Sequence, residues 1–308
     1  LSAWFLPGWF PDCNWRKSYI TEIPTDYDLC VEKYGEDSIN CNIIAQLDDT
    51  GACPEVNEDG TVKITKMEAT NNYLCSAPDD YGTSYYYRGT VENNWVKFAD
   101  SYWRILRING DGSIRMIYAG DANVIDALPN KEEVLKNGYD DSSTDYTQIG
   151  TSAFNSSRND NAYVGYMYGI RGSSTYEETH RNINSSTIKT AVDTWYESHI
   201  KDTEYEQYLA DTLFCNDRSS ATDNTGTGAG TSDTNYRADN TNVHTLYCKN
   251  QNDRFTVNDE TIGNGDLTYP IGLLIIDEAY LAGGRGDNSS YYLYTGNDYK
   301  TMSPHSFT

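Results

Sequence analysis

The sequence has no apolar segment long enough to cross a membrane. A spanning helix needs about 20 consecutive apolar residues, whereas the longest apolar runs here are LSAWFL at the start and IGLLII at 271–276. The chain begins with Leu rather than Met. We therefore expect a processed protein or a fragment, which meets a membrane only through an anchor outside this chain.

Basic residues are scarce. The chain has 23 Lys and Arg against 46 Asp and Glu, which gives a formal net charge of −23. Such a chain repels nucleic acid and anionic lipid, so neither is an expected partner. The simplest interpretation of the acidity is a solvated surface that keeps the protein soluble.

Residue patterns that mark catalytic centres are also missing. There are only four His, none of them in an HxxxH or HExxH context, and the sequence contains neither a CxxC pair nor GxSxG. TGTGAGT at 225–231 has the composition of a phosphate loop but follows no predicted strand and opens no predicted helix. We predict no catalytic residues, and a protein that is not an enzyme is favoured.

Two acidic turns raise the question of calcium. NEDGT at 57–61 and NGDGS at 109–113 combine carboxylates with Gly, but neither completes a twelve-residue calcium loop with its terminal Glu. No cofactor is therefore predicted. Calcium stays open as an alternative, and the residues of any metal site are unknown.

Aromatic residues are abundant by contrast. The 27 Tyr and 6 Trp supply large buried areas together with polar groups. An exposed Tyr is also a good recognition residue, because it loses little conformational entropy on contact. Together with many Asn, Ser, Thr and Gly, this composition predicts a β-rich extracellular protein.

Seven cysteines fit disulfides in an oxidising compartment better than cytosolic thiols. Proximity along the chain favours three pairs and leaves Cys13 over, although spacing alone does not determine connectivity. The favoured pairs are Cys30–Cys41, Cys53–Cys75 and Cys215–Cys248.

Residues 1–75 are predicted to form a small Cys-bearing N-terminal module. A short helical pattern runs from 28 to 45, and Asp59-Gly60 forms a turn before a short strand. The clearest local pattern follows this module. Alternating residues at 103–108 and 113–118, joined by NGDG, predict a β-hairpin.

Helical periodicity returns further along the chain. Ser186 is a plausible N-cap for a helix that buries Ile188, Ala191, Val192 and Trp195. A second helical stretch is predicted to contain Tyr205, Tyr208 and Leu209 in register.

The C-terminal third combines a low-complexity loop with a β–α pattern. The loop between Cys215 and Cys248 cannot bury a core. The segment 268–284 is predicted to be a buried strand that runs into a helix. Asp277 and Glu278 lie in the first turn of this helix, where the helix dipole favours negative charge, so a structural role is enough to explain them. Residues 291–303 are predicted to return to β-structure. RGD at 285–287 is a known adhesive tripeptide, but three residues are weak evidence.

Several longer segments carry a family resemblance. YYYRG, YWRILRINGDGSIRMIYAG, TYPIGLLIIDEAYLAGG and YYLYTGNDYKTMSP resemble a family of uncharacterised exported proteins of gut Firmicutes. That family is remotely similar to C-type-lectin-like folds, including formylglycine-generating-enzyme-like domains. The resemblance implies a scaffold without activity, because no Cys follows Cys248 and the catalytic cysteine pair of those enzymes has no counterpart.

The expected fold is therefore α+β: a C-type-lectin-like domain at 76–308 with β-hairpins and one or two helices. The chain stops at Thr308 before the final strand of such domains, so we expect a C-terminal truncation. The predicted function is a bacterial cell-surface or secreted binding or adhesion protein, whose partner is a host or bacterial surface glycan or protein. The alternatives are a pilin-like or envelope subunit and an extracellular glycan-acting hydrolase. The predicted ligand-binding residues are Asp287, Asn288, Tyr291, Tyr292, Tyr294 and Tyr299; ordinary strand packing is the competing role for these tyrosines.

Overall fold

A computed structural model describes most of the chain. The described residues are 26–36, 38–46, 53–65, 72–137, 146–158, 160–221, 227–284, 288–296 and 300–307. The chain forms two compact units, residues 1–45 and 46–308. The predicted boundary at residue 75 lies inside a strand, β3 (Asn72–Asp79), which pairs along its whole length with β4 (Gly82–Gly89). Residues 53–75 therefore belong to the second unit.

In the first unit, the predicted helical pattern forms two helices, α1 (Asp26–Tyr34) and α2 (Ile39–Ile44). Gly35 separates them with a φ of 88°, a left-handed conformation that glycine adopts without strain. The Cys30–Cys41 disulfide then joins α1 to α2, with the two Cα atoms 5.5 Å apart.

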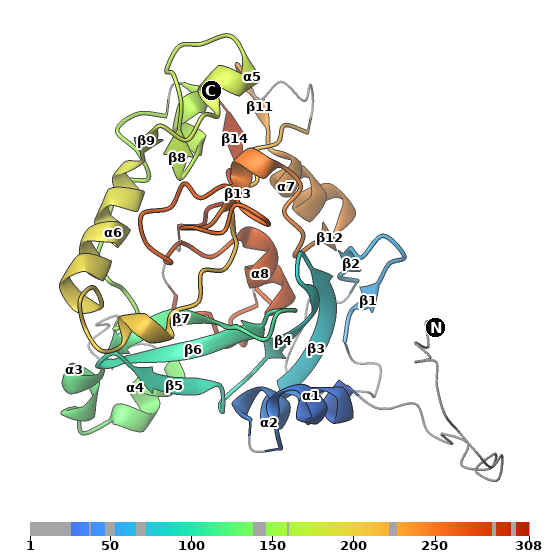
Figure 1. The fold of residues 1–308 in the computed structure, drawn as a ribbon, viewed down its shortest axis with the longest axis vertical. Helices are drawn as coiled ribbons and strands as arrows, with labels where there is room; N and C mark the ends of the chain where they lie inside the picture. The colour runs from blue at the N-terminus through green and yellow to red at the C-terminus, as the bar shows by residue number, and fades with distance from the viewer. Residues whose placement is uncertain are drawn as a thin grey trace, which may run out of the picture. The chain divides into compact units, whose positions relative to one another are not determined.

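The second unit is built on a five-stranded antiparallel sheet (Figure 1). β6 (Ser101–Ile108) is its centre: one edge pairs with β7 (Ile114–Asp121), and the other pairs with β5 (Trp95–Phe98) and the end of β4. The hairpin predicted around NGDG is confirmed as β6–β7. A mixed α+β structure with several antiparallel sheets is thereby confirmed as well.

Two turns of this sheet touch each other. Asp79 Oδ1 accepts a hydrogen bond from the Tyr81 amide in the β3–β4 turn, and Asp79 Oδ2 accepts one from the Gly110 amide in the β6–β7 turn. A Cβ on Gly110 would lie 2.4 Å from the Gly82 nitrogen. Gly110 is therefore needed for the close backbone approach, whereas Gly112, with a φ of 90°, suits the turn itself.

The predicted helix after Ser186 is confirmed as α6 (Thr187–His199), with Ser186 Oγ accepting from the Lys189 amide. Its inner face packs on the sheet through Trp195, whose ring lies 6.0 Å from that of Trp103 and 5.2 Å from that of Tyr118. Ala191, which was expected to be buried, is exposed instead because it lies at the border of that inner face.

Three other predictions about local structure are wrong. The stretch around Tyr208 is only a 3₁₀ turn, η2 (Glu206–Tyr208), with Tyr208 72% exposed. Residues 271–275 form no strand before α8 (Ile276–Leu281), and the described residues within 291–303 form none either. Their described residues make isolated backbone hydrogen bonds, such as the one from the Met302 amide to the Leu274 carbonyl at 2.9 Å, rather than the repeated pairs of a strand ladder.

The α8 helix lies beside β4 (Figure 1). Arg88 of β4 donates hydrogen bonds to the carbonyl oxygens of Tyr280 and Leu281 at 2.9 and 2.7 Å. The Tyr280 carbonyl also accepts from the Gly283 amide at 3.0 Å, so Arg88 adds to the hydrogen bonds that end the helix. A buried guanidinium therefore fixes the C-terminal end of α8 to the sheet.

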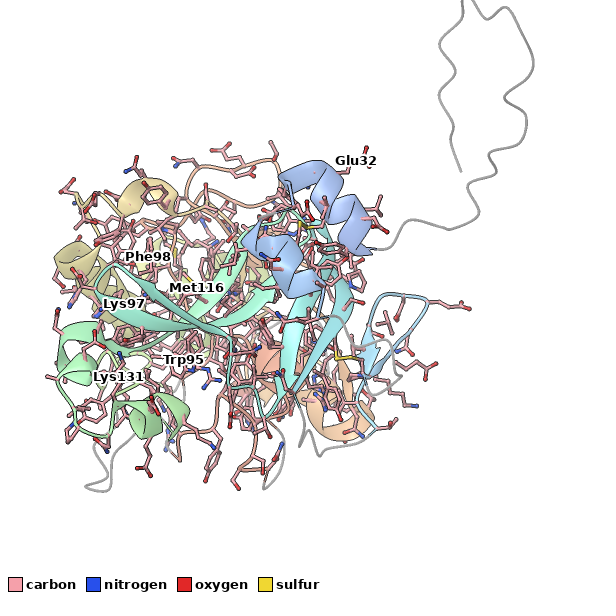
Figure 2. All side chains as sticks on the ribbon, turned by 90° about the horizontal axis from the view of Figure 1, so that it is seen from below. Glu32, Trp95, Lys97, Phe98, Met116 and Lys131 are labelled. Atoms are coloured by element: carbon pink, nitrogen blue, oxygen red, sulfur yellow. A yellow bond between two sulfur atoms is a disulfide. The ribbon has the colours of Figure 1, made fainter. Side chains whose placement is uncertain are left out.

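A charged cluster attaches α3 (Ala122–Asp126) and α4 (Lys131–Asn137) to the sheet. Asp126 accepts from Lys97, Lys131 and the Tyr102 hydroxyl at 2.7, 2.5 and 2.6 Å. Figure 2 shows Lys97 and Lys131 close together at this side of the unit. The hydrogen bonds from Lys131 and Lys97 hold the pKa of the Asp126 carboxyl well below its usual range.

The remaining elements are short. The predicted turn at Asp59-Gly60 joins β1 to β2, which pair with each other, and the Cys53–Cys75 disulfide ties this pair to β3. β12 pairs with β2 in the same sheet, and three two-stranded sheets pair β10 with β13, β11 with β14 and β8 with β9. Their bounds are β1 (Glu55–Val56), β2 (Val62–Lys63), η1 (Asn161–Val164), β8 (Met167–Tyr168), α5 (Tyr176–Thr179), β9 (Asn184–Ser185), β10 (Phe214–Cys215), β11 (Gly230–Thr231), α7 (Asp233–Tyr236), η3 (Arg237–Thr241), β12 (Val243–His244), η4 (Gln251–Asp253), β13 (Arg254–Phe255) and β14 (Ser306–Phe307).

Candidate functional site

The predicted ligand-binding residues fall into two groups. Asp287 and Tyr299 lie outside the described residues, as does the RGD segment at 285–287. Asn288 is described, and it has a local structural role: its Nδ2 donates to the Gly283 carbonyl at 2.7 Å, and its Oδ1 accepts from the Ser290 amide at 3.0 Å. These bonds shape the loop after α8.

The structure brings three of the predicted tyrosines together. Tyr291 packs its ring on Gly284, where a Cβ would approach the ring to 2.6 Å, and the ring lies 6.3 Å from that of Tyr294. Tyr292 is 8% exposed, whereas Tyr294 is 46% exposed. Packing therefore accounts for Tyr292, and Tyr294 is the member of this group that presents its ring to solvent.

Tyr292 packs against a buried cation. The Arg104 guanidinium lies 5.0 Å from the centre of the Tyr292 ring and 4.3 Å from that of Trp95. Its Nε donates to Asn94 Oδ1 at 2.9 Å, and it also donates to the Val91 carbonyl. Burial raises the pKa of the Tyr292 hydroxyl far above its usual value. This hydroxyl is therefore a neutral, packed group rather than an acid or base.

A small crevice lies beside this stack. Trp95, Tyr118, Lys136 and Tyr294 are among the residues that line it, and it encloses about 20 Å³. A site of this size holds roughly one water molecule. It can accept a methyl group or the tip of a side chain, but it cannot enclose a substrate.

A second and much larger hollow lies over α6. It has a volume of about 640 Å³ and is lined by residues of three segments: the loop at 152–156, the β8–β9 pair and the outer face of α6. We call it the α6 groove. Its lining residues are Ser152, Asn155, Ser156, Tyr168, Ser185, Thr187, Thr190, Ala191 and Thr194. Its volume falls in the range of about 300–1,000 Å³ that is typical of small-ligand sites, but the groove is broad and open to solvent rather than an enclosed pocket.

Sequence reasoning missed this groove. The visible signal was the spacing of Thr187, Thr190 and Thr194, which places three hydroxyls on one face of a helix whose other face is apolar. The loop and the β8–β9 pair that complete the groove meet α6 only through tertiary packing, so no local pattern connects them.

The acidic pair at the start of α8 is buried and ion-paired. Glu278 Oε1 lies 2.6 Å from Arg115 Nε and 3.2 Å from Arg107 Nε, and Arg107 also pairs with Asp79 at 2.9 Å. Glu278 Oε2 further accepts from the Ile275 amide. These bonds fix the N-terminal end of α8 to β6 and β7, and this agrees with the structural role expected for the pair.

Asp277 points into a second ionic cluster. It forms an ion pair with Arg237 at 3.1 Å, and its Oδ1 lies 3.2 Å from His244 Nδ1. The same oxygen accepts a hydrogen bond from the Thr245 amide. Burial alone would raise the pKa of the Asp277 carboxyl, but the hydrogen bond with His244 and the charge of Arg237 lower it. Asp277 therefore stays ionised as a structural anion.

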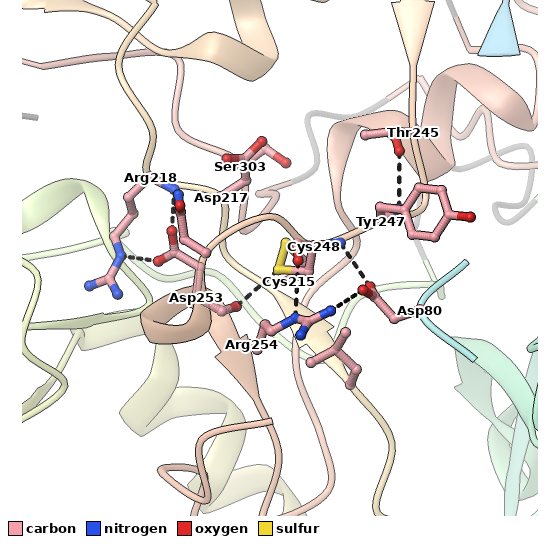
Figure 3. The surroundings of a disulfide bond; sticks show 12 residues. Asp80, Cys215, Asp217, Arg218, Thr245, Tyr247, Cys248, Asp253, Arg254 and Ser303 are labelled. Carbon is pink, nitrogen blue, oxygen red and sulfur yellow. Dashed lines mark hydrogen bonds and ion pairs between the residues drawn. A yellow bond between two sulfur atoms is a disulfide. The ribbon is translucent and has the colours of Figure 1, made fainter. Parts of the chain in front are cut away.

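The Cys215–Cys248 disulfide closes the low-complexity loop at its base, and ionic contacts surround it (Figure 3). Asp80 accepts from the Cys248 amide at 2.8 Å and from the Arg254 guanidinium, which also donates to the Cys248 carbonyl at 3.0 Å. The disulfide is thereby tied to the turn between β3 and β4.

A third buried pair joins Arg218 to Asp253 at 2.5 Å, and both side chains are almost completely buried. His180 lies close by and stacks on Tyr176 with the ring centres 4.0 Å apart. Burial, helped by the charge of Arg218, lowers the pKa of His180 to about 4. His180 is therefore neutral at physiological pH.

The two acidic turns considered for calcium use their carboxylates internally. Asp59 Oδ1 accepts from the Thr61 amide and hydroxyl, and Asp111 Oδ1 accepts from the same groups of Ser113. Within the described ranges, no group of three or more His, Cys, Asp and Glu residues is arranged to hold a metal ion. Calcium binding stays an untested alternative.

Among the residues that the structure describes, no helix is long and apolar enough to cross a lipid bilayer. Comparisons of the chain with protein-family models, with curated proteins and with solved structures found no match.

Proposed function

We propose that this chain is an exported bacterial protein, secreted or held at the cell surface, that binds a host or bacterial surface glycan or protein without catalysing a reaction. The observation that carries this proposal is Tyr294, a half-exposed residue that lines the crevice together with Trp95 and Tyr118. Exposed aromatic rings set in rigid surroundings are frequent anchors in protein interfaces.

Two further observations support the proposal. The three disulfides fit an oxidising, extracellular environment. The acidic pair of α8 is fully engaged in buried ion pairs that position the helix, so its function is structural and it is not a candidate pair of catalytic carboxylates. The net charge of −23 disfavours nucleic acid as the partner.

The finer fold assignment belongs to the same proposal. A C-type-lectin-like scaffold would carry its ligand-binding loops on an antiparallel sheet that is packed against short helices. The sheet of β3 to β7 with α8 fixed to β4, followed by long irregular segments, is compatible with such a scaffold. Binding residues are commonly found on loops held by a rigid framework of this kind.

Replacing Tyr294 with Ala tests the proposal. The purified chain would be titrated onto intact bacterial cells and onto host epithelial cells, and bound protein would be measured by flow cytometry. We expect Tyr294→Ala to raise the apparent Kd about tenfold or more, as loss of an aromatic anchor does. The matched control is Tyr208→Ala, because Tyr208 is even more exposed but lies outside the crevice.

Wild-type binding by Tyr294→Ala, or equal losses in both variants, would contradict the assignment of Tyr294. Filaments in electron micrographs, together with no binding to either cell type, would instead support the alternative of a pilin-like or envelope subunit.

A further inference from the structure

The α6 groove is a broad, open hollow of ligand size, and three segments form its walls. Trp195 and Val192 fix the inner face of α6 against the unit, so that Thr187, Thr190 and Thr194 face outward on a rigid helix. The β8–β9 pair abuts the N-terminal end of this helix, because Ser186 follows β9 directly and its amide donates to the Tyr166 carbonyl at 3.0 Å. Ile188 N–H donates to the Phe154 carbonyl, which holds the third wall, the loop at 152–156.

The hydroxyls of the groove are oriented by their own hydrogen bonds. Thr190 Oγ1 donates to the Ser186 carbonyl at 3.1 Å, Thr194 Oγ1 donates to the Thr190 carbonyl at 2.8 Å, and Ser152 Oγ donates to the Ala153 carbonyl at 2.8 Å. Each hydroxyl has one hydrogen and two lone pairs. With the hydrogen used, these oxygens present acceptors, which suits a ligand that carries many O–H donors.

Asn155 adds the complementary group. Its Oδ1 accepts from the Ser156 amide at 2.9 Å, while its Nδ2 is buried without a hydrogen-bond partner among the described residues. An unsatisfied buried donor costs free energy that a partner recovers. Asn155 lines the groove, so a rotation of its amide toward the hollow would let a ligand oxygen become such a partner.

Tyr168 gives the groove an apolar face. Its ring is held 5.1 Å from that of Tyr163, and the Tyr163 hydroxyl in turn accepts from Arg171 at 3.1 Å. A positioned Tyr ring offers a large apolar surface at little entropic cost. A ligand with an apolar C–H face and a hydroxyl edge fits this combination.

The lining carries no charge: none of the described lining residues is Asp, Glu, Lys, Arg or His. An ionic ligand would find no counter-charge there, and the net charge of −23 disfavours anions in particular. Hydrolysis of a glycosidic bond usually needs two carboxylates at the cleft, and the described lining supplies neither.

We propose that the α6 groove binds a short neutral oligosaccharide, without cleaving it. The inference rests on the proposed binding function, but it does not depend on Tyr294, which lines the separate crevice. The groove holds the sugar hydroxyls with threonine and serine oxygens, while Tyr168 supports the apolar face of the sugar ring.

The test fills the groove without touching the core. Ala191→Trp places an indole in the groove from an exposed helical position, and Ser198→Trp places one on an exposed position of the same helix outside the described lining. Both variants and the wild type would be applied to an array of neutral oligosaccharides of glucose, galactose, mannose and N-acetylglucosamine, with sialylated and uronate-containing glycans beside them. Affinities for the retained sugars would be measured by calorimetry, and folding by circular dichroism.

We expect the wild type to retain neutral glycans, Ala191→Trp to weaken this binding at least tenfold, and Ser198→Trp to stay within about twofold of wild type, as surface changes away from a site usually do. The inference is overturned if no neutral glycan binds at millimolar concentration, if the charged glycans are preferred, or if Ala191→Trp binds like the wild type.

Tyr294→Ala separates the two proposals. If this variant loses cell binding but keeps glycan affinity, both assignments stand as independent sites. If cell binding depends on Tyr294 and the glycan array is blank, only the groove inference fails. If Ala191→Trp blocks glycan binding and Tyr294→Ala binds cells as well as the wild type does, the groove inference stands and the Tyr294 assignment fails.

Discussion

The two ends of α8 and the outer face of α6 use polar residues in opposite ways. Around α8, acids and arginines are buried and paired: Glu278 with Arg107 and Arg115, and Asp277 with Arg237. On α6, the outward residues that line the groove are three threonines and an alanine, and none of the lining residues that the structure describes is charged.

The difference follows from what each polar group does in water. A buried charge is stable only with a partner, so ionic groups inside the unit are committed to holding elements together and are not available to a ligand. Hydroxyls at a surface keep lone pairs that can exchange water for ligand at little cost. Around α8, buried charge therefore holds the structural frame together, whereas the hydroxyls on the outer face of α6 are free to contact a ligand.

The largest expected effect comes from breaking the buried ion pairs around α8, which form the structural frame of this region. Glu278→Gln leaves Arg107 and Arg115 buried beside a neutral amide, with only Asp79 as a remaining acidic partner. Removal of one partner from a buried ion pair costs about 3–5 kcal/mol. We expect a loss of this size in the free energy of unfolding, measured by urea denaturation.

Glu177→Gln is the matched control, because Glu177 lies on an exposed position of α5. Its effect should stay within about 0.5 kcal/mol. An equally small loss for Glu278→Gln would show that the ionic contacts around α8 are not part of the frame.

A smaller effect is expected from pH. The pKa of His180 is about 4 in the folded protein, against about 6.5 in an unfolded chain. Between these values the unfolded chain binds the extra proton and the folded one does not, so stability falls as the pH drops from about 6.5 to about 4. The full loss amounts to about 3 kcal/mol.

The measurement is the free energy of unfolding at pH 7, 5.5 and 4 for the wild type and for His180→Gln. Because carboxylates titrate in both proteins, the difference between the two pH slopes isolates His180. Parallel slopes would mean that His180 is solvated in the folded protein, contrary to its stacking on Tyr176 and its position beside Arg218.

The sequence predicted the helices, hairpins and disulfides better than it predicted the irregular segments that pack between them. The β6–β7 hairpin, α6 with its Ser186 cap and the three disulfide pairs of the structure all follow from local alternation, capping or proximity. The apolar run at 271–275 predicts a buried strand. It is irregular in the structure, since an apolar run also fits any segment that crosses a core.

The candidate sites show the same limit. Tyr292 and Tyr294 are two positions apart, and no sequence pattern distinguishes them. In the structure Tyr292 packs on Arg104, whereas Tyr294 is half exposed. That distinction depends on Arg104, which lies far away in the sequence. The α6 groove could not be predicted for a related reason: its three walls come from separate segments, and only the threonine face of α6 is visible locally.

The smallest effect on stability, and the sharpest contrast with Glu278→Gln, is expected on α6. Thr190→Val with Thr194→Val keeps the β-branched shape and removes two hydroxyls whose hydrogens are bonded within the helix. The free energy of unfolding should change by less than about 0.5 kcal/mol, since both positions are exposed. Affinity for a neutral oligosaccharide should nevertheless fall about threefold to tenfold, the usual worth of a hydrogen bond or two. Ser198→Ala removes a similarly bonded hydroxyl outside the described lining and should change neither quantity. A double variant that lost several kcal/mol of stability would place these threonines in the frame, and the division between charged frame and neutral recognition surface would fail.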